Sequence, residues 1–166
     1  MPDLPEISDN PAVAGVAASG IAFQVVEHGP VRSLAEAAAA RGVAIPDVVK
    51  TIVVRLSEGD YRFVLVPGDR VISWPKLRAL LGVARMSMPD AATAKEATGF
   101  ERGTITPFGS STAWPVIADE RIRGREITLG GGRHGVALAV SADAAIAALD
   151  ATVADVSEPE PPPSKG

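Results

Sequence analysis

The alternation of apolar and polar residues predicts a chain of short strands interleaved with short helices. Runs rich in β-branched residues and bounded by Gly, Pro, Asn or Asp indicate strands; these runs are residues 21–27, 48–54, 61–66, 114–118, 126–129, 136–140 and 152–156. A further short strand is predicted around residues 84–88. Alanine- or leucine-rich segments that follow a capping residue or a proline indicate helices; these segments are residues 12–19, 34–41, 74–81, 90–97 and 142–149. This order predicts an α/β (mixed α+β) domain with helices on the outside of a mixed sheet.

The chain divides into three segments by composition. Residues 1–9 are acidic and proline-rich and are expected to form a flexible N-terminus. Residues 10–156 carry all the predicted elements and are long enough for one domain with a core of its own. Residues 157–166 are acidic and contain three consecutive prolines, so we expect a disordered tail there.

One lysine interrupts the most apolar strand of the pattern. In the segment Val48–Val54, six of the seven residues are β-branched, and the exception is Lys50. Within a strand, Lys50 shares its face with Val48, Ile52 and Val54. Because desolvating an ammonium group is costly without a partner, Lys50 either extends to the strand end or meets a polar or anionic ligand. The sequence leaves both possibilities open.

Two glycine-rich loops could bring backbone N–H groups close to a ligand. The first reads Gly-Thr-Ile-Thr-Pro-Phe-Gly over residues 103–109, and the second is Gly130–Gly135, which contains His134. Glycine lets a ligand approach main-chain N–H groups, so such loops suit carbonyl or phosphate oxygens. The alternative for the first loop is an ordinary turn between two elements.

The composition excludes several chemistries. The chain has no cysteine, which excludes disulfides, thiolate zinc sites and a cysteine nucleophile. His28 and His134 are its only histidines, and we expect neither a metal nor another cofactor. His28 lies in a predicted turn, and its interpretation as a turn residue is favoured over a catalytic one. Asp119 either caps a turn or lines a pocket.

Charge and hydropathy bear on partners and location. The net charge of −4 argues against extensive contact with a nucleic-acid backbone. The four arginines within residues 121–133 suit a solvated surface or the recognition of a single nucleotide or acceptor end. No stretch approaches the roughly 20 apolar residues of a membrane span, and the N-terminus is unlike a signal peptide. We therefore expect a cytoplasmic protein without membrane association; its oligomeric state is not predicted.

Three motifs in this order resemble the YbaK/ProX family. They are Lys50-Thr51, Gly103-x-x-x-Pro107-Phe108-Gly109 and Gly132-Arg133-His134, and the similarity extends from about Phe23 to Val156. The family comprises trans-editing aminoacyl-tRNA deacylases related to the editing domain of prolyl-tRNA synthetases. The resemblance implies the prolyl-tRNA synthetase-associated domain fold, with a curved, partly barrel-like mixed sheet.

The resemblance also implies an activity and a site. The implied reaction is hydrolysis of the ester that joins a mischarged amino acid to the terminal adenosine of tRNA, with tRNA-Pro as the expected substrate. The tRNA acceptor end is the implied partner, and a prolyl-tRNA synthetase is a further candidate partner. The implied catalytic residues are Lys50, Gly103 and His134. The implied substrate-binding residues are Thr51, Thr106, Pro107, Phe108 and Gly132.

Departures from the family pattern bear on specificity. Many relatives have a second glycine where this chain has Thr104, and some have an aspartate in the strand that here begins Gly135-Val136-Ala137. The missing polar group suggests a small or apolar amino-acid pocket, for alanine, serine or cysteine.

The residue types favour direct attack by water over a covalent intermediate. The chain has no Gly-x-Ser-x-Gly elbow. Backbone N–H groups of the Gly103 turn could form an oxyanion hole. Two other functions stay open: a non-catalytic module that binds an aminoacyl or nucleotide ligand, and, ranked last, a nucleotide-phosphate loop at Gly130–Gly135, which lacks the P-loop ending.

Overall fold

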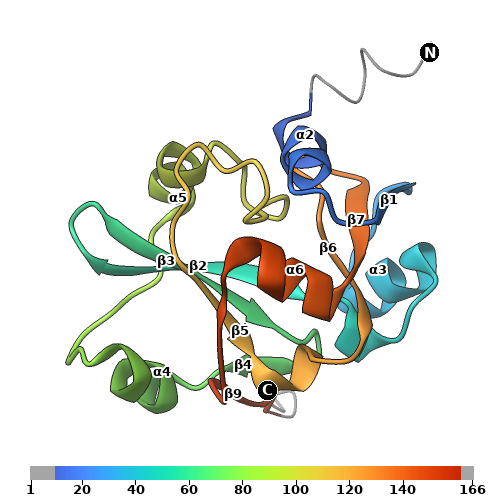
Figure 1. Ribbon diagram of the computed structural model, residues 1–166. Coiled ribbons are helices and arrows are strands. Elements are labelled where there is room, and N and C mark those ends of the chain that lie inside the picture. Colours follow the sequence, from blue (N-terminus) through green and yellow to red (C-terminus); the bar gives the residue numbers. More distant parts are fainter. Residues whose placement is uncertain (1–9, 162–166) are drawn as a thin grey trace.

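The strands form a four-stranded sheet, a three-stranded sheet and a two-stranded ribbon in the computed structural model, which describes residues 10–161 (Figure 1). The four-stranded sheet has the order β2-β3-β5-β8, from β2 (Lys50–Ser57), β3 (Asp60–Val66), β5 (Val116–Asp119) and β8 (Thr152–Ala154). The three-stranded sheet has the order β1-β7-β6, from β1 (Phe23–Glu27), β7 (Val136–Ser141) and β6 (Glu126–Gly130). The ribbon pairs β4 (Arg70–Ile72) with β9 (Ser157–Pro159).

Helices surround these sheets and begin where the capping residues predict (Figure 1). They are α2 (Pro11–Ala18), α3 (Leu34–Arg41), α4 (Trp74–Leu81), α5 (Ala91–Thr98) and α6 (Ala142–Leu149), with short 3-10 turns η1 (Ile45–Asp47) and η2 (Glu120–Ile122). The Ser33 hydroxyl accepts a hydrogen bond from the Glu36 N–H, and Gly42 ends α3 in the left-handed conformation. Ser73, by contrast, precedes α4 without a side-chain capping bond. The predicted mixed α+β class is therefore confirmed.

The two larger sheets meet where β2 begins. Val48 forms a parallel bridge with Thr128 of β6, and the Val49 N–H donates to the Thr128 carbonyl over 2.9 Å. This bridge joins the two sheets. Because β6 runs into Gly130, this contact sets the start of β2 beside the second glycine-rich loop.

Two apolar cores lie on the two sides of β2. Val53 belongs to the main core with Phe63, Leu65 and Leu138, whereas Val54 belongs to a smaller core under α4. The alternation of strand side chains puts Lys50 on the side of Val54. The Lys50 side chain therefore leaves β2 on the side of the smaller core.

Three predictions about local structure were wrong. Residues 84–88 form no strand, and only Ser87 pairs there, through backbone hydrogen bonds with Arg55. Residues 70–72 were predicted to be a loop or were left unassigned, yet they form β4. The tail from residue 157 was predicted to be disordered, yet its first three residues form β9. The predicted flexible segment 1–9 and residues 162–166 lie outside the described residues.

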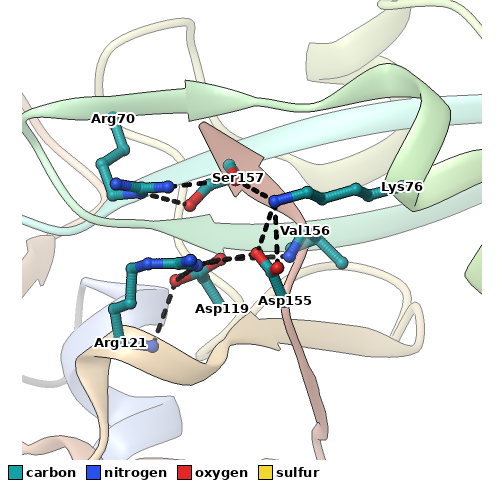
Figure 2. Close-up of polar contacts among 7 residues, drawn as sticks. All are labelled: Arg70, Lys76, Asp119, Arg121, Asp155, Val156 and Ser157. Atoms are coloured by element: carbon teal, nitrogen blue, oxygen red, sulfur yellow. Dashed lines mark hydrogen bonds and ion pairs between the residues drawn. The ribbon is translucent and has the colours of Figure 1, made fainter. Parts of the chain in front are cut away.

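A buried carboxylate explains why the chain is ordered past residue 156. Asp119 is fully buried and accepts hydrogen bonds from the backbone N–H groups of Val156 and Arg121 (Figure 2). Arg121 links Asp119 to Asp155 at 2.8 Å, and Lys76 also binds Asp155. Arg70 donates to the Ser157 hydroxyl over 2.7 Å. These long-range contacts fix β9, and the composition of the tail gave no sign of them.

We predict an acid-sensitive stability term at Asp155. Hydrogen bonds from Arg121 and then Lys76 lower the pKa of Asp155 to about 2. Because this pKa is lower when folded than when unfolded, the stabilisation is present above about pH 4 and is lost as the pH falls toward about 2. Asp155→Asn should therefore flatten the dependence of the urea midpoint on pH in this window. The exposed Glu96→Gln is the control; an equal flattening there would contradict the assignment.

Candidate functional site

The two glycine-rich loops pack against each other backbone to backbone. Gly103 has a φ of +89°, and a Cβ built on it would lie 3.7 Å from Cε1 of His134. The Gly132 N–H donates to the Thr104 carbonyl over 3.0 Å. A Cβ on Gly130 would lie 2.7 Å from the Ile105 carbonyl oxygen. Three of the predicted site residues, Gly103, Gly132 and His134, therefore come together, and the glycines are needed for the close approach.

Helix α2 holds both loops from one side (Figure 1). Asn10 is buried; its Oδ1 caps the helix, and its Nδ2 donates to the Gly131 carbonyl over 3.0 Å. Gly109 packs so closely that an added Cβ would lie 1.9 Å from the Pro11 carbonyl oxygen. The sequence signalled the helix cap at Asn10 but not its bond to a loop 121 residues away.

We predict that Asn10→Ala loosens both loops. The variant loses a helix cap and leaves the buried Gly131 carbonyl without its donor, so unfolding should become easier by about 2 kcal/mol. The matched control is Ser33→Ala, which removes only a cap, at an exposed position. Urea unfolding of the two variants measures the difference. Equal losses would show that the bond from Asn10 to Gly131 contributes nothing.

A cavity of about 440 Å³ lies beside the meeting point of the loops. We call it the basic cavity; it is lined by the 28–31 turn, Val136 and the residues His28, Arg41, Gly103, Arg133, His134 and Gly135. Four of these side chains are basic, and no acidic side chain of the described residues lines it. Its composition suits a ligand that carries negative charge or carbonyl oxygens.

A second cavity, of about 390 Å³, lies on the other side of His134. Thr104, Gly132, Lys95 and Glu101 line it together with Arg133 and His134. The Nε2 atom of His134 lies 3.6 Å from a carboxylate oxygen of Glu101, and the imidazole is 73% exposed. His134 therefore lies at the boundary between the two cavities, in contact with solvent.

Backbone donors are available where the basic cavity meets the loops. Within residues 10–161, the N–H groups of Gly103 and His134 form no hydrogen bond. By contrast, the N–H groups of Thr104 and Gly132 are occupied by loop carbonyls. Within the first loop, Gly103 therefore has an N–H group without a hydrogen-bond partner and also lines the basic cavity. Such a donor can stabilise a developing oxyanion.

Lys50 does not join the other two predicted catalytic residues. Its ammonium donates to the Arg70 carbonyl, and it lines neither described cavity beside His134. Burial lowers the pKa of Lys50, and the nearby charges of Glu160 and Asp69 oppose that shift. The backbone of Lys50 nevertheless follows directly on the residues that contact β6. We predicted from the sequence that the Lys50 ammonium lies in one cleft with Gly103 and His134, and the structure does not place it there.

Three of the predicted substrate-binding residues are buried in the structure. Thr106, Pro107 and Phe108 are buried and line neither cavity beside His134; Phe108 is 3% exposed and belongs to the main core. Thr51 lies on the opposite face of β2 from Lys50. The Phe108 ring packs into the main core beneath the loop that carries Gly103, and substrate binding by these residues stays a prediction.

The cavity lining includes Arg41, which the sequence analysis did not single out, and His28, which it placed in a turn. Both line the basic cavity, but in the sequence Arg41 is an ordinary basic residue in the last turn of a helix. Asp119, left undecided by the sequence, caps η2 and belongs to the buried network, not to either cavity beside His134. Within residues 10–161, no group of three or more His, Asp or Glu side chains is placed to hold a metal ion. None of the helices described is long and apolar enough to cross a membrane.

Comparisons with known proteins agree with the sequence motifs. Residues 28–147 match the model of the aminoacyl-tRNA editing domain. A proline–tRNA ligase of Thermosipho melanesiensis is 35% identical over 97 residues, which are 58% of this chain and 17% of the ligase. The chain therefore spans about a sixth of that relative's length.

Two crystal structures share the fold over most of both chains. A candidate trans-editing enzyme for prolyl tRNA synthetase superposes with a TM-score of 0.82 at 27% identity, covering 89% of this chain and 95% of that one. A hypothetical protein superposes with a TM-score of 0.79 at 30% identity, covering 86% and 96%.

Proposed function

Because the chain belongs to the aminoacyl-tRNA editing domain family, we propose that it hydrolyses the ester of a mischarged tRNA in the basic cavity. The observation that carries the proposal is the placement of an unoccupied Gly103 N–H and the His134 ring at one wall of that cavity. The similarity to a proline–tRNA ligase supports tRNA-Pro as substrate, and the residues of the strand that begins Gly135-Val136-Ala137 favour alanine, serine or cysteine as the amino acid. It also supports a prolyl-tRNA synthetase as a partner.

The proposed reaction is direct attack by water. The water oxygen bonds to the ester carbonyl carbon, and the Gly103 N–H donates a hydrogen bond to the carbonyl oxygen as negative charge develops on it. His134 takes the proton from the water and returns it to the ribose oxygen as the ester bond breaks. The products are the free amino acid and the tRNA hydroxyl. The exposure of His134 gives water access to its ring.

A panel of aminoacylated tRNA-Pro tests this function. The chain is mixed with Ala-, Ser- and Cys-tRNA-Pro, with Pro-tRNA-Pro as the correctly charged control, and loss of the ester is followed. Faster loss of at least one mischarged ester, slowed in His134→Ala, supports the enzyme. Binding of the tRNA without ester loss would support the alternative, a non-catalytic aminoacyl or nucleotide-binding module of the same fold.

Lys50 stays a predicted catalytic residue, and its role requires movement. Its ammonium would have to leave the Arg70 carbonyl to position the substrate. If it does, Lys50→Met should slow deacylation by roughly 10-fold, because the variant keeps the apolar stem and removes one charge-assisted contact. Thermal unfolding serves as the structural readout. Unchanged deacylation by the folded variant would remove Lys50 from the mechanism and leave it as an anchor for β4.

A further inference from the structure

Two side-chain nitrogen atoms of residues that line the basic cavity are buried without a partner. They are Nε of Arg41 and Nε2 of His28, and neither forms a hydrogen bond within the described part of the chain. Both residues line the basic cavity. A buried polar atom without a partner costs stability, and such atoms are uncommon in folded proteins. Two of them in one cavity wall point to a ligand that supplies the partners.

The Arg41 guanidinium is fixed in place for such a ligand. Arg41 is the last residue of α3, and its Nη1 donates to the Thr128 hydroxyl of β6 over 3.1 Å. This bond crosses between two elements and holds one edge of the guanidinium, while Nε has no partner. Because arginine stays protonated in proteins, the cavity wall carries a permanent positive charge with an oriented donor.

His28 offers the opposite kind of group. Its Nδ1 lies 2.8 Å from the Gly29 carbonyl oxygen, which can only accept a hydrogen bond. Nδ1 therefore carries a proton, and in the tautomer with this single proton Nε2 is an acceptor. The cavity thus presents a charged donor at Arg41 and an acceptor at His28.

A nucleotide has the two complementary groups. Its phosphate accepts hydrogen bonds from a guanidinium, and its ribose hydroxyl donates to an imidazole nitrogen. An aminoacyl group alone brings an ammonium and an ester but no anion. The guanidinium of Arg41 in the cavity lining also favours a phosphate.

We propose that Arg41 binds the 5′-phosphate of the terminal adenosine of tRNA and that His28 accepts a hydrogen bond from its ribose 2′-hydroxyl. This assignment rests on the proposed function, because it places the terminal nucleotide beside Gly103 and His134. Arg41 and His28 then act as binding residues that orient the ester toward the reacting groups.

Binding of small nucleotides tests the assignment without any turnover. Dissociation constants of the full chain are measured for adenosine 5′-monophosphate, adenosine and 2′-deoxyadenosine 5′-monophosphate. Wild type should bind the monophosphate roughly 10- to 100-fold more tightly than adenosine, as expected for a hydrogen bond to a charged group. Arg41→Gln should abolish this difference. His28→Phe should keep it and abolish the preference for the 2′-hydroxyl.

Two control variants separate ligand binding from structure and net charge. Thr128→Val removes the hydrogen bond to Arg41 but keeps the guanidinium, and Arg123→Gln removes an exposed charge that lines neither cavity beside His134. Arg123→Gln should keep the preference for the monophosphate, and Thr128→Val, which leaves the guanidinium charged but no longer held, should reduce the preference without abolishing it. The proposal is overturned if wild type binds adenosine as tightly as the monophosphate, or if Arg41→Gln keeps the preference. A chain that shows this binding pattern but deacylates nothing would contradict the proposed function alone.

Discussion

Replacing Gly109 by alanine is expected to lower the free energy of unfolding by about 4 kcal/mol. Gly109 has a φ of +76°, and its added Cβ would lie 1.9 Å from the Pro11 carbonyl oxygen and 2.9 Å from the Ala12 nitrogen. All of these are backbone atoms, so no side chain can move aside. The first turn of α2 must shift, and its contact with the loop that carries Gly103 is lost.

Gly82→Ala is the matched control for this variant. Gly82 also has a positive φ, of +67°, but nothing lies within 4 Å of its added Cβ. It should therefore cost only about 1 kcal/mol, from backbone strain alone. Urea unfolding of both variants measures the difference. A Gly109→Ala variant that is at least as stable as Gly82→Ala would contradict the close packing of α2 against the loop.

Replacing Gly103 by alanine is expected to slow deacylation about 100-fold, as removal of one oxyanion donor does in other enzymes. The positive φ of +89° is unfavourable for alanine, so the backbone turns and its N–H is displaced from the cavity wall. The added Cβ meets only Cε1 of His134, at 3.7 Å, which is an ordinary contact. The effect should thus appear in the rate constant far more than in stability.

Gly124→Ala separates the loss of the donor from backbone strain. Gly124 has a φ of +75° and open space around its added Cβ, and it lines neither cavity beside His134. It should lose as much stability as Gly103→Ala and keep its deacylation rate. Equal rates for the two variants in single-turnover assays would remove Gly103 from the mechanism.

Local signals in the sequence were sufficient for most of the helices. Ser33, Glu36 and Gly42 predicted the bounds of α3, and the structure confirms them, because caps depend on residues within one turn. The pairing of β4 with β9 was missed, because each strand is short and the partner lies 87 positions away. Only the buried Asp119 network explains why the tail pairs there.

The candidate site was predictable where backbone geometry decides it. Gly103 and Gly132 are glycines because of positive φ angles and close approach, and both features leave a mark in the sequence. The Lys50 ammonium was not predictable, since strand alternation gives its face but not its hydrogen-bond acceptor. Arg41 was missed because its role follows from a contact with Thr128 on another element. Contacts that long side chains make between separate elements are therefore the hardest feature to predict from the sequence.

The central claim is that the aminoacyl ester binds in the basic cavity, between Gly103 and His134. The most direct test is a backbone amide NMR titration of the full chain with a 3′-aminoacyl-adenosine analogue in which an amide replaces the ester. We expect the largest chemical-shift changes at the backbone amides of Gly103, His134 and Gly135. Shifts confined to the surface depression lined by Arg55, Arg78 and Arg85, with none at the two glycine-rich loops, would contradict it.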